Sequence, residues 1–488
     1  MSRLRAGLSP DVERAAGYRD RVEPLPLTAA HIVSATGGRI LRGAAGAPIG
    51  RLSIDSRTLQ AGDVFVALRG ERFDGHAFVA DAVAHGASGV MVQDGSAVPE
   101  GARPELIVEV EDTTRALQQI ARDVRRRSEV RVAAVTGSAG KTTTKEIAAE
   151  FLSARYRVFR NEGNLNNHIG LPLSLLELRA RPDVAVVEFG MNHPGEIRTL
   201  VGIAEPEVRV WTNVGDAHMG FFGSADDIAD AKAEILEAAR PGDVLVANAD
   251  DPRVMARAPR FEGRVVTFAI EAAADVRATG VQQKGLEGTA ARVTTRAGEV
   301  TVRTPLLGMG NLANVLAATA VAIEFGVPLE AVAERAARLT PAKRRGELQR
   351  LPGGLTLIDD SYNSSPAALK RALEVIASAT GSARKVAVLG EMLELGAHSA
   401  TLHRECGAAA AAARLDLLIA VGGPGASELA EAAVAAGMPE RCVSYAGTSA
   451  EAATLALERV RPGDLVLVKG SRGIGTDVVV ERLKQEFA

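Results

Sequence analysis

The feature that most constrains the fold of this chain is a glycine-containing loop between an apolar segment and a helical one. Residues 130–135 are rich in valine and alanine, as a buried strand is, and a helical pattern ends near residue 154. Between them lie Thr136, Gly137, Ser138, Ala139, Gly140, Lys141 and Thr142. Glycines in such a unit let backbone N–H groups approach phosphate oxygens, and the helix directs its positive end at the same anion. The sequence therefore predicts an ATP-binding site.

The spacing of this loop departs from the general phosphate-binding pattern. The strict form has a glycine at the position of Val135, so the match is to a tighter variant of the loop. A simple glycine turn between strand and helix is the alternative, and the Gly-Lys-Thr ending argues against it. Lys141 would supply a point charge for the β- and γ-phosphates, and the Thr142 hydroxyl could hold Mg²⁺.

Composition excludes several classes of function. A chain of 488 residues is too long for one hydrophobic core, so we expect several domains. A net charge of −3 and an aromatic content of 3% argue against nucleic acid as a partner. Cys406 and Cys442 form neither a disulfide framework nor a metal-ligand spacing, which fits a reducing compartment. No apolar run has the length of a membrane span. We expect a cytoplasmic protein that acts as a monomer.

Apolar segments alternate with helical ones through most of the chain. This alternation predicts an α/β fold with parallel sheets covered on both faces. We expect residues 1–26 to form a disordered extension, residues 125–128 a solvated linker and residues 276–305 a hairpin. Three domains are expected: a small α/β domain at 27–128, a central phosphate-loop ATPase domain at 129–342 and a Rossmann-like domain at 343–488.

Candidate ligands follow two apolar segments of the central domain. Glu188 ends the segment 184–187, where phosphate-loop proteins place a metal-binding carboxylate, although a solvated glutamate is an equal alternative. His218 follows the segment 208–211 and so belongs to the same carboxyl edge of the sheet, where open α/β sheets bind ligands. A lone loop histidine is otherwise more often structural. Lys232 falls in a helical pattern whose spacing predicts an exposed lysine.

Polar segments elsewhere are candidates for substrate contacts. Residues 161–172 are dense in amides and form either an ordinary polar loop or a substrate-binding one. In the last domain, residues 359–363 and 469–473 each end a strand, and both should face one cleft. Arg344 and Arg345 precede that domain's first strand. An arginine there either binds a phosphate through two of its N–H groups or is a solvent-exposed charge at a hinge between domains.

These motifs together resemble the Mur ligases of peptidoglycan synthesis. The resemblance extends from about residue 27 to about residue 480. It is carried by residues 53–57, 62–76, 136–142, 163–172, 359–363, 390–396 and 469–472. The variant loop of the family also lacks the glycine at Val135. The pattern is similar to the branch that adds D-alanyl-D-alanine to UDP-N-acetylmuramoyl-tripeptide.

The resemblance implies an ATP-dependent amide ligase that uses Mg²⁺ and an acyl phosphate. The catalytic residues that it implies are Lys141, Glu188, His218, Lys232 and Arg345. The metal ligands that it implies are Thr142, Glu188, His218 and a carbamylated Lys232. Besides the glycine loop, the nucleotide contacts are Asn314 at the adenine, Asp360 at the ribose and Arg345 at the phosphates. The contacts to the UDP-sugar, the tripeptide and the acceptor are Ser56, Arg57, Asn164, Asn166, Asn167, Asn363, Lys469 and Ser471.

Two positions depart from the family's pattern, and alternatives stay open. Gly310 stands where a histidine is common, and Gly220 where a glutamate is common. One alternative is the same chemistry on another substrate, as in a third-residue ligase or a folate or amino-acid polymer ligase; the asparagine-rich segment argues against it. The other is a non-ligase phosphate-loop ATPase. The third residue of the tripeptide, lysine or diaminopimelate, is not determined.

Overall fold

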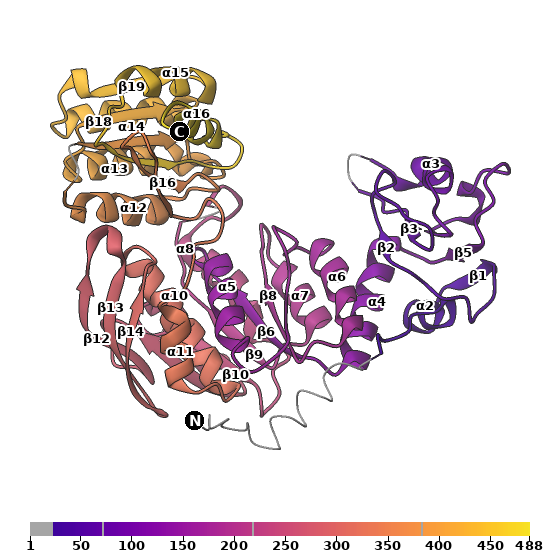
Figure 1. The fold of residues 1–488 in the computed structure, drawn as a ribbon. Coiled ribbons are helices and arrows are strands. Elements are labelled where there is room, and N and C mark those ends of the chain that lie inside the picture. The colour runs from indigo at the N-terminus through magenta and orange to yellow at the C-terminus, as the bar shows by residue number, and fades with distance from the viewer. Residues whose placement is uncertain (1–22, 71–72, 217–218, 382–383) are drawn as a thin grey trace, which may run out of the picture. The chain divides into compact units, whose positions relative to one another are not determined.

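The computed structural model describes residues 23–70, 73–216, 219–381 and 384–488, which Figure 1 colours from indigo to yellow. The chain packs as two compact units. The first consists of the residues up to 131 with 161–185 and 202–205, and the second of 132–160, 186–201 and 206–488. Sheets of five, nine and six strands organise the described residues. The predicted α/β class is confirmed.

The five-stranded sheet lies in the first unit and has the order β1-β5-β4-β3-β2. Its strands are β1 (Arg39–Arg42), β2 (Leu52–Ser53), β3 (Val64–Val66), β4 (Gly89–Val92) and β5 (Leu106–Glu109). β1 runs antiparallel to β5, and the other neighbours are parallel. The helices of this part are α2 (Ala29–Thr36), α3 (Val79–Ala84) and α4 (Thr113–Ser128). Phe65, Val79 and Val90 bury their apolar side chains in one core, which fixes α3 on the sheet.

Two predictions concern the first unit. Residues 1–22 of the extension predicted to be disordered lie outside the described residues, so that part stays a prediction. Leu25, near the end of the same segment, is 5% exposed, and its N–H donates to Arg179 O at 2.7 Å. Residues 125–128, predicted to be a linker, form the last turn of α4. The Arg125 side chain is buried because its guanidinium donates to two backbone carbonyl oxygens. Basic residues also suit the negative end of a helix, so this arginine run ends an element rather than joining two.

The nine-stranded sheet has the order β14-β13-β12-β11-β10-β9-β6-β8-β7. Its strands are β6 (Arg131–Thr136), β7 (Val158–Arg160), β8 (Val184–Glu188), β9 (Val208–Trp211), β10 (Val244–Asn248), β11 (Arg264–Ala269), β12 (Val276–Gln283), β13 (Thr289–Thr295) and β14 (Gly298–Thr304). The pairings from β6 through β9, β10 and β11 to β12 are parallel, and those from β12 to β14 are antiparallel. The segment predicted as a hairpin is therefore a meander of three strands.

The helices that accompany this sheet include the one that follows the glycine loop. They are α5 (Lys141–Leu152), α6 (Gly170–Leu175), α7 (Glu196–Ala204), α8 (Ala225–Ala233), α9 (Pro252–Arg257), α10 (Gly308–Glu324) and α11 (Leu329–Ala336). α10 packs along α5, and its Leu312, Val315 and Leu316 are fully buried. α5 is thereby held by packing as well as by its own backbone hydrogen bonds. Among the described residues, every helix is too short or too polar to cross a lipid bilayer.

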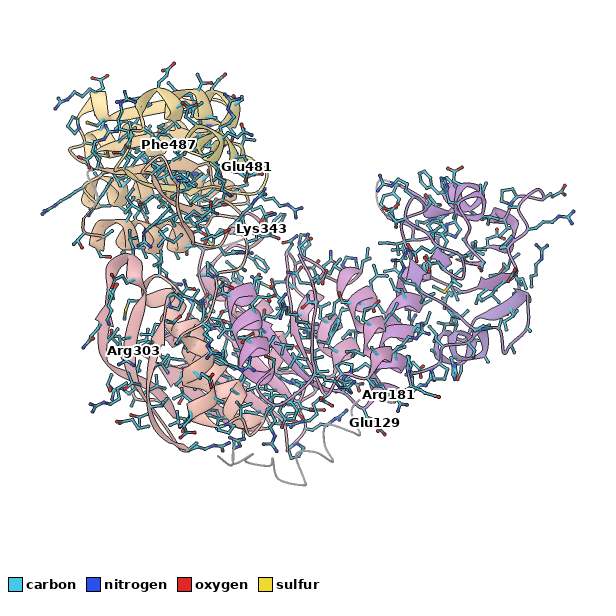
Figure 2. All side chains as sticks on the ribbon, viewed as in Figure 1. Glu129, Arg181, Arg303, Lys343, Glu481 and Phe487 are labelled. Carbon is cyan, nitrogen blue, oxygen red and sulfur yellow. The ribbon has the colours of Figure 1, made fainter. Side chains whose placement is uncertain are left out.

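The six-stranded sheet has the order β15-β16-β20-β17-β18-β19, and β15 is antiparallel to its neighbour. Its strands are β15 (Glu347–Arg350), β16 (Thr356–Asp360), β17 (Lys385–Gly390), β18 (Leu417–Val421), β19 (Val443–Ala446) and β20 (Leu465–Lys469). Its helices are α12 (Pro366–Ser378), α13 (Ser399–Ala412), α14 (Pro424–Ala435), α15 (Ser449–Arg459) and α16 (Asp477–Glu486). Alternate strand residues enter two separate cores, and Phe487, labelled in Figure 2, belongs to one of them. The sheet is therefore covered on both faces, as in a doubly wound domain.

A buried histidine connects α13 to the loop that follows β17. His403 is fully buried, its Nε2 accepts the Met392 N–H at 2.9 Å, and its Nδ1 lies 2.8 Å from Ser399 O. These contacts suit the neutral ring with its proton on Nδ1, because Nε2 must accept. Burial lowers the pKa of His403 below its ordinary value of 6.5, since the charged ring would lose its hydration.

This burial predicts that the protein loses stability in mild acid. The unfolded chain binds a proton at His403 below about pH 6.5, whereas the folded chain resists doing so until the pH is lower. The free energy of unfolding should therefore fall as the pH drops through 6.5, by at most about 1.4 kcal/mol per pH unit from this group. Urea titrations of the wild type and of His403→Gln at pH 7.5 and 5.5 measure the effect. An unchanged pH dependence in His403→Gln would contradict it.

Candidate nucleotide-binding site

Glycine is required at two positions of the loop between β6 and α5. Gly137 has φ +148° and Gly140 has φ +83°, in the region that favours glycine. A Cβ atom on Gly137 would overlap the Thr212 side chain, and one on Gly140 would overlap the side-chain oxygen of Asn314. The loop backbone thus passes directly against two side chains, which leaves no room for a larger residue at either glycine. The order β6, loop, α5 confirms the predicted strand–loop–helix arrangement.

The segment after β9 braces the glycine loop from one side. Asn213 Oδ1 accepts the Ala139 N–H at 2.9 Å, and Thr212 Oγ1 donates to Ala139 O at 2.7 Å. Ser138 Oγ accepts the Gly215 N–H at 2.9 Å. Thr212 and Asn213 were not predicted to contact the glycine loop. Their place directly after β9, at the carboxyl edge of the parallel sheet, is the signal that could have identified them.

Charged and hydroxyl groups meet at the first turn of α5. Thr142 Oγ1 donates to Glu188 Oε2 at 2.7 Å, and Glu188 is only 4% exposed. Lys141 Nζ donates to Gly137 O at 2.9 Å, which curls the side chain back over the loop. Burial lowers the pKa of Lys141, the Glu188 carboxylate opposes that shift, and the Arg345 charge adds to it. A hydroxyl beside a carboxylate is a pair of hard oxygen ligands of the kind that Mg²⁺ prefers.

Lys232 is buried, which corrects the exposed position expected from its helical spacing. It lies in α8 with 1% of its surface exposed. Burial moves its pKa well below the ordinary lysine value, and the nearby charge of Lys141 moves it further down. Among the described residues, no carboxylate pairs with it. Burial without an anionic partner favours the uncharged form of a lysine amine over its charged form.

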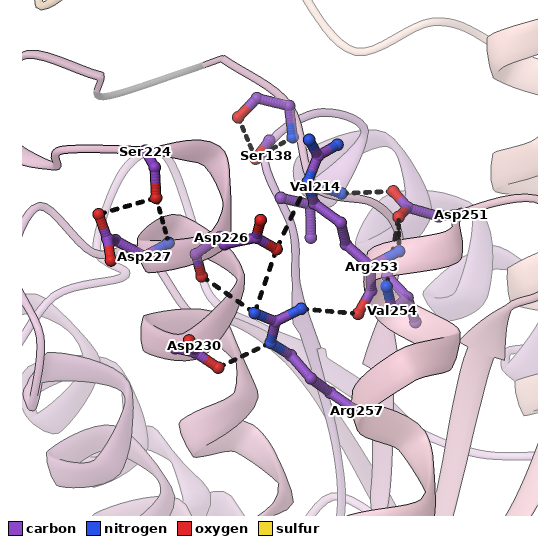
Figure 3. A network of polar contacts seen from close by, with 11 residues as sticks. Ser138, Val214, Ser224, Asp226, Asp227, Asp230, Asp251, Arg253, Val254 and Arg257 are labelled. Atoms are coloured by element: carbon purple, nitrogen blue, oxygen red, sulfur yellow. Dashed lines mark hydrogen bonds and ion pairs between the residues drawn. The ribbon is translucent and has the colours of Figure 1, made fainter.

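A polar network fixes α8 relative to the loop that follows β9 (Figure 3). Arg257 Nε donates to Asp230 Oδ1 at 2.7 Å, and its Nη2 donates to Asp226 O at 3.2 Å. Arg257 belongs to α9, whose N-cap residue Asp251 also accepts the Val214 N–H at 2.7 Å. One short helix therefore orients both the helix that carries Lys232 and the segment that braces the glycine loop. Neither Asp251 nor Arg257 was singled out from the sequence.

The predicted metal ligands differ in what the structure describes. Thr142 and Glu188 are in contact, and their role as metal ligands stays a prediction. His218 lies outside the described residues, so its role stays a prediction. Among the residues that are described, no group of three or more His, Cys, Asp or Glu side chains gathers as a metal site.

Arg345 reaches the glycine loop from the segment before β15. Its Nη2 donates to Thr142 Oγ1 at 3.3 Å, so the guanidinium lies beside the hydroxyl that contacts Glu188. Arg344 instead forms an ion pair with Asp477 at 3.0 Å. The two neighbouring arginines therefore have different partners: Arg345 contacts the loop, and Arg344 pairs with the first residue of α16.

The other predicted nucleotide contacts are held by polar partners. Asn314 Oδ1 lies 3.2 Å from Thr144 Oγ1, and its Nδ2 donates to Asn311 Oδ1 at 3.2 Å. The Asn314 side chain is therefore fixed against the first turn of α5. At the end of β16, Asp360 Oδ2 pairs with Lys469 Nζ at 2.7 Å.

The substrate-contact candidates fall into two groups. In the six-stranded sheet, Lys469 Nζ also donates to Asn363 O, and Ser471 Oγ accepts the Leu393 N–H at 3.0 Å. These contacts join the motifs at 359–363, 390–396 and 469–472 at one edge of that sheet. The two segments expected to face one cleft are therefore in direct contact.

The remaining candidates lie in the first unit. Arg57 donates to both carboxylate oxygens of Asp55, and this bonding lowers the pKa of Asp55 to about 2. Asn167 Oδ1 accepts the Gly170 N–H at 2.8 Å at the start of α6. Exposed or half-buried side chains next to these contacts are Ser56, Asn164 and Asn166. Arg57 and Asn167 thus have local partners, and their contacts to substrate stay predictions.

Comparison with known proteins places this site in a family. Three family models match the chain: "Mur ligase family, catalytic domain" at residues 48–125, "Mur ligase middle domain" at 135–322 and "Mur ligase, glutamate ligase domain" at 344–472. The UDP-N-acetylmuramoyl-tripeptide–D-alanyl-D-alanine ligase of Bacillus subtilis is 36% identical over 432 residues, 88% of this chain and 92% of that protein. The Escherichia coli ligase of the same name is 36% identical over 436 residues, covering 89% and 93%.

Solved structures give the same result. A crystal structure of MurF from Acinetobacter baumannii has a TM-score of 0.85 and 33% identity, and the match covers 95% of this chain and all of that one (100%). The MurF ligase of Thermotoga maritima in complex with ADP has a TM-score of 0.78 and 30% identity, covering 90% and 97%. With its glycine loop, its Glu188–Thr142 pair and these relatives, the chain belongs to the Mur ligase family.

Proposed function

We propose that this chain is an ATP-dependent ligase that joins D-alanyl-D-alanine to the terminal carboxylate of UDP-N-acetylmuramoyl-tripeptide. The observation that carries the proposal is the meeting of Lys141, Arg345 and the Thr142–Glu188 pair at one loop, because these groups suit a transfer between two anions. Relatives with this activity in their names align over about nine-tenths of the chain. ATP and a UDP-linked substrate place the reaction in cytoplasmic precursor synthesis.

The first chemical step joins two negatively charged reactants. A carboxylate oxygen of the tripeptide attacks the γ-phosphorus of ATP, the bond from that phosphorus to the β-bridging oxygen breaks, and ADP leaves. Charge repulsion dominates such a barrier, and positioned cations lower it. Lys141 and Arg345 are the cations at the loop. Mg²⁺, when bound, adds positive charge at the phosphates, and Thr142, Glu188 and His218 would hold it.

The second step forms the amide. The uncharged amine of D-alanyl-D-alanine attacks the carbonyl carbon of the acyl phosphate, and the tetrahedral intermediate expels phosphate and loses a proton. Water competes for the same acyl phosphate, so the site must exclude it. The motifs at 359–363, 390–396 and 469–472 form one hydrogen-bonded edge, where we place the acceptor contacts of Asn363, Lys469 and Ser471.

Lys232 fits the role of a carbamylated metal ligand. An uncharged buried amine is the form that adds to CO₂, giving a carbamate and releasing a proton. Lys232 is buried, and no acidic side chain among the described residues pairs with it. A carbamate on this lysine would be an oxygen ligand of the kind that Mg²⁺ takes.

The remaining proposed contacts assign the nucleoside and the substrates to particular residues and domains. Asn314 would contact the adenine and Asp360 the ribose, at opposite ends of the nucleoside. Residues 27–128 would bind the UDP-sugar with Ser56 and Arg57, residues 129–342 would carry the ATP site, and residues 343–488 would bind the acceptor. Asn164, Asn166 and Asn167 would contact the substrate from the asparagine-rich segment. These side chains combine donors and acceptors, as recognition of a peptide requires.

Phosphate release in a matrix of substrates tests the proposal. UDP-N-acetylmuramoyl-tripeptide, with lysine or diaminopimelate at its third position, is combined with D-alanyl-D-alanine, D-alanine, L-lysine or L-glutamate. We expect turnover with D-alanyl-D-alanine only, and the preferred tripeptide identifies the third residue. Turnover with a single amino acid would indicate another ligase of the family. ATP hydrolysis that ignores both substrates would indicate a non-ligase ATPase.

A further inference from the structure

A tyrosine ring lies under the arginine that reaches the glycine loop. The Arg345 guanidinium carbon is 4.1 Å from the centroid of the Tyr362 ring, within the range of a cation–π contact. The same guanidinium donates to Thr142 Oγ1 at 3.3 Å. Thr142 in turn contacts Glu188. One planar cation therefore bridges the face of an aromatic ring and the phosphate-binding loop.

The backbone fixes the separation of the ring and the arginine. Gly346 N–H donates to Asp359 O at 2.9 Å, and Tyr362 N–H donates to Arg344 O at 3.2 Å. These two hydrogen bonds enclose Arg345 between them and extend the β15–β16 pairing. The ring is thereby placed against the Arg345 side chain by main-chain geometry, before any ligand binds.

The Arg345 guanidinium lies near another cation and therefore needs a favourable contact to hold it in place. Its charge lowers the pKa of Lys141, so the two cations repel each other. Among the described residues, Arg345 has no carboxylate at ion-pair distance. A carboxylate would satisfy its N–H donors and compete with a phosphate for them. The face of an aromatic ring attracts the guanidinium without occupying any of those donors.

We propose that Tyr362 is a positioning residue that holds the Arg345 guanidinium in place for the γ-phosphate of ATP. The inference rests on the proposed ligase function and adds a residue that acts through Arg345 alone. The face of the Tyr362 ring positions the guanidinium, and the Tyr362 hydroxyl does not contribute. Arg472, whose guanidinium carbon lies 6.0 Å from the same centroid, adds a second cation near the ring.

Tyr362→Leu should lower kcat for ligation about tenfold, the size of a partly desolvated cation–π contact. Tyr362→Phe should restore kcat to within about twofold, because it keeps the ring face. The dissociation constant of ADP should stay the same in both variants, since ADP lacks the γ-phosphate. Steady-state kinetics with varied ATP and calorimetric titration with ADP give these readouts. Retained ADP binding also shows that each variant is folded, and Tyr362→Met serves if the leucine variant does not fold.

Two further variants distinguish a loss of Arg345 positioning from a nonspecific loss of structure or activity. Tyr445→Leu makes the same exchange at a half-exposed tyrosine of β19 and should leave kcat unchanged. Adding Tyr362→Leu to Arg345→Ala should cause no further loss, because the ring acts only through that arginine. A loss in Tyr362→Phe equal to that in Tyr362→Leu, or independent effects in the double variant, would overturn the inference. A wild type without ligase activity would instead refute the proposed function.

Discussion

Lys232→Ala is expected to reduce ligation about a thousandfold, and short carboxylic acids should restore part of the activity. The side chain is 1% exposed and has no acidic partner among the described residues. If it carries a carbamate, its removal deletes an anionic oxygen ligand and leaves a small cavity in α8. Acetate or propionate can enter that cavity and supply a carboxylate to the same place. Phosphate release at increasing acid concentrations measures the rescue.

The matched control for this rescue is a lysine that acts as a cation. Lys141→Ala loses a positive charge at the same loop, so carboxylic acids should give it no activity. Full ligation by untreated Lys232→Ala would remove the carbamate from the mechanism. A Lys232 variant that is inactive and indifferent to carboxylic acids would show that the lysine acts as an amine or cation. A ¹³C-labelled bicarbonate experiment on the wild type checks the carbamate by a readout other than activity.

The part of the site that could be predicted from the sequence is the part encoded by short segments. The glycine loop, Thr142 and the strand-end Glu188 follow from residues close together in the chain, because the carboxyl ends of parallel strands share one edge. The sheet order around β6 and the contact between Thr142 and Glu188 agree with that expectation. Short motifs are enough to predict a site when its residues all lie at the carboxyl ends of parallel strands, because those ends share one edge of the sheet.

What could not be predicted depends on contacts between distant segments. Helical spacing predicts an exposed Lys232, yet its side chain in α8 is only 1% exposed in the folded chain. The arginine run at 125–128 has linker composition, but carbonyl oxygens nearly eighty residues away bind Arg125 and complete the helix. The position of the Tyr362 ring beside Arg345 depends on the pairing of β15 with β16, which no residue pattern predicts. The burial of a side chain depends on residues far away in the chain, and these partners cannot be identified from a single sequence.

Lys141→Met is expected to abolish ATP-dependent turnover, with a loss of at least about a thousandfold. Lys141 Nζ lies over the glycine loop, 2.9 Å from Gly137 O, where it can reach phosphate oxygens. Methionine keeps most of the apolar volume, so the loss reports the charge rather than the packing. Phosphate release with all substrates present measures the effect. Binding of ADP should weaken less than turnover, because the charge matters most in the transition state.

Lys484→Met is the matched control for the charge of Lys141. Lys484 lies in α16, pairs with Glu481 at 3.3 Å and has no assigned role in the site, so this variant should turn over at the wild-type rate. Lys141→Arg separates charge from shape, since a planar guanidinium cannot follow the ammonium into the space beside the loop. Ligation by Lys141→Met above about a tenth of the wild-type rate would mean that the loop does not bind the phosphates, because so central a cation cannot be worth less than about 1.4 kcal/mol.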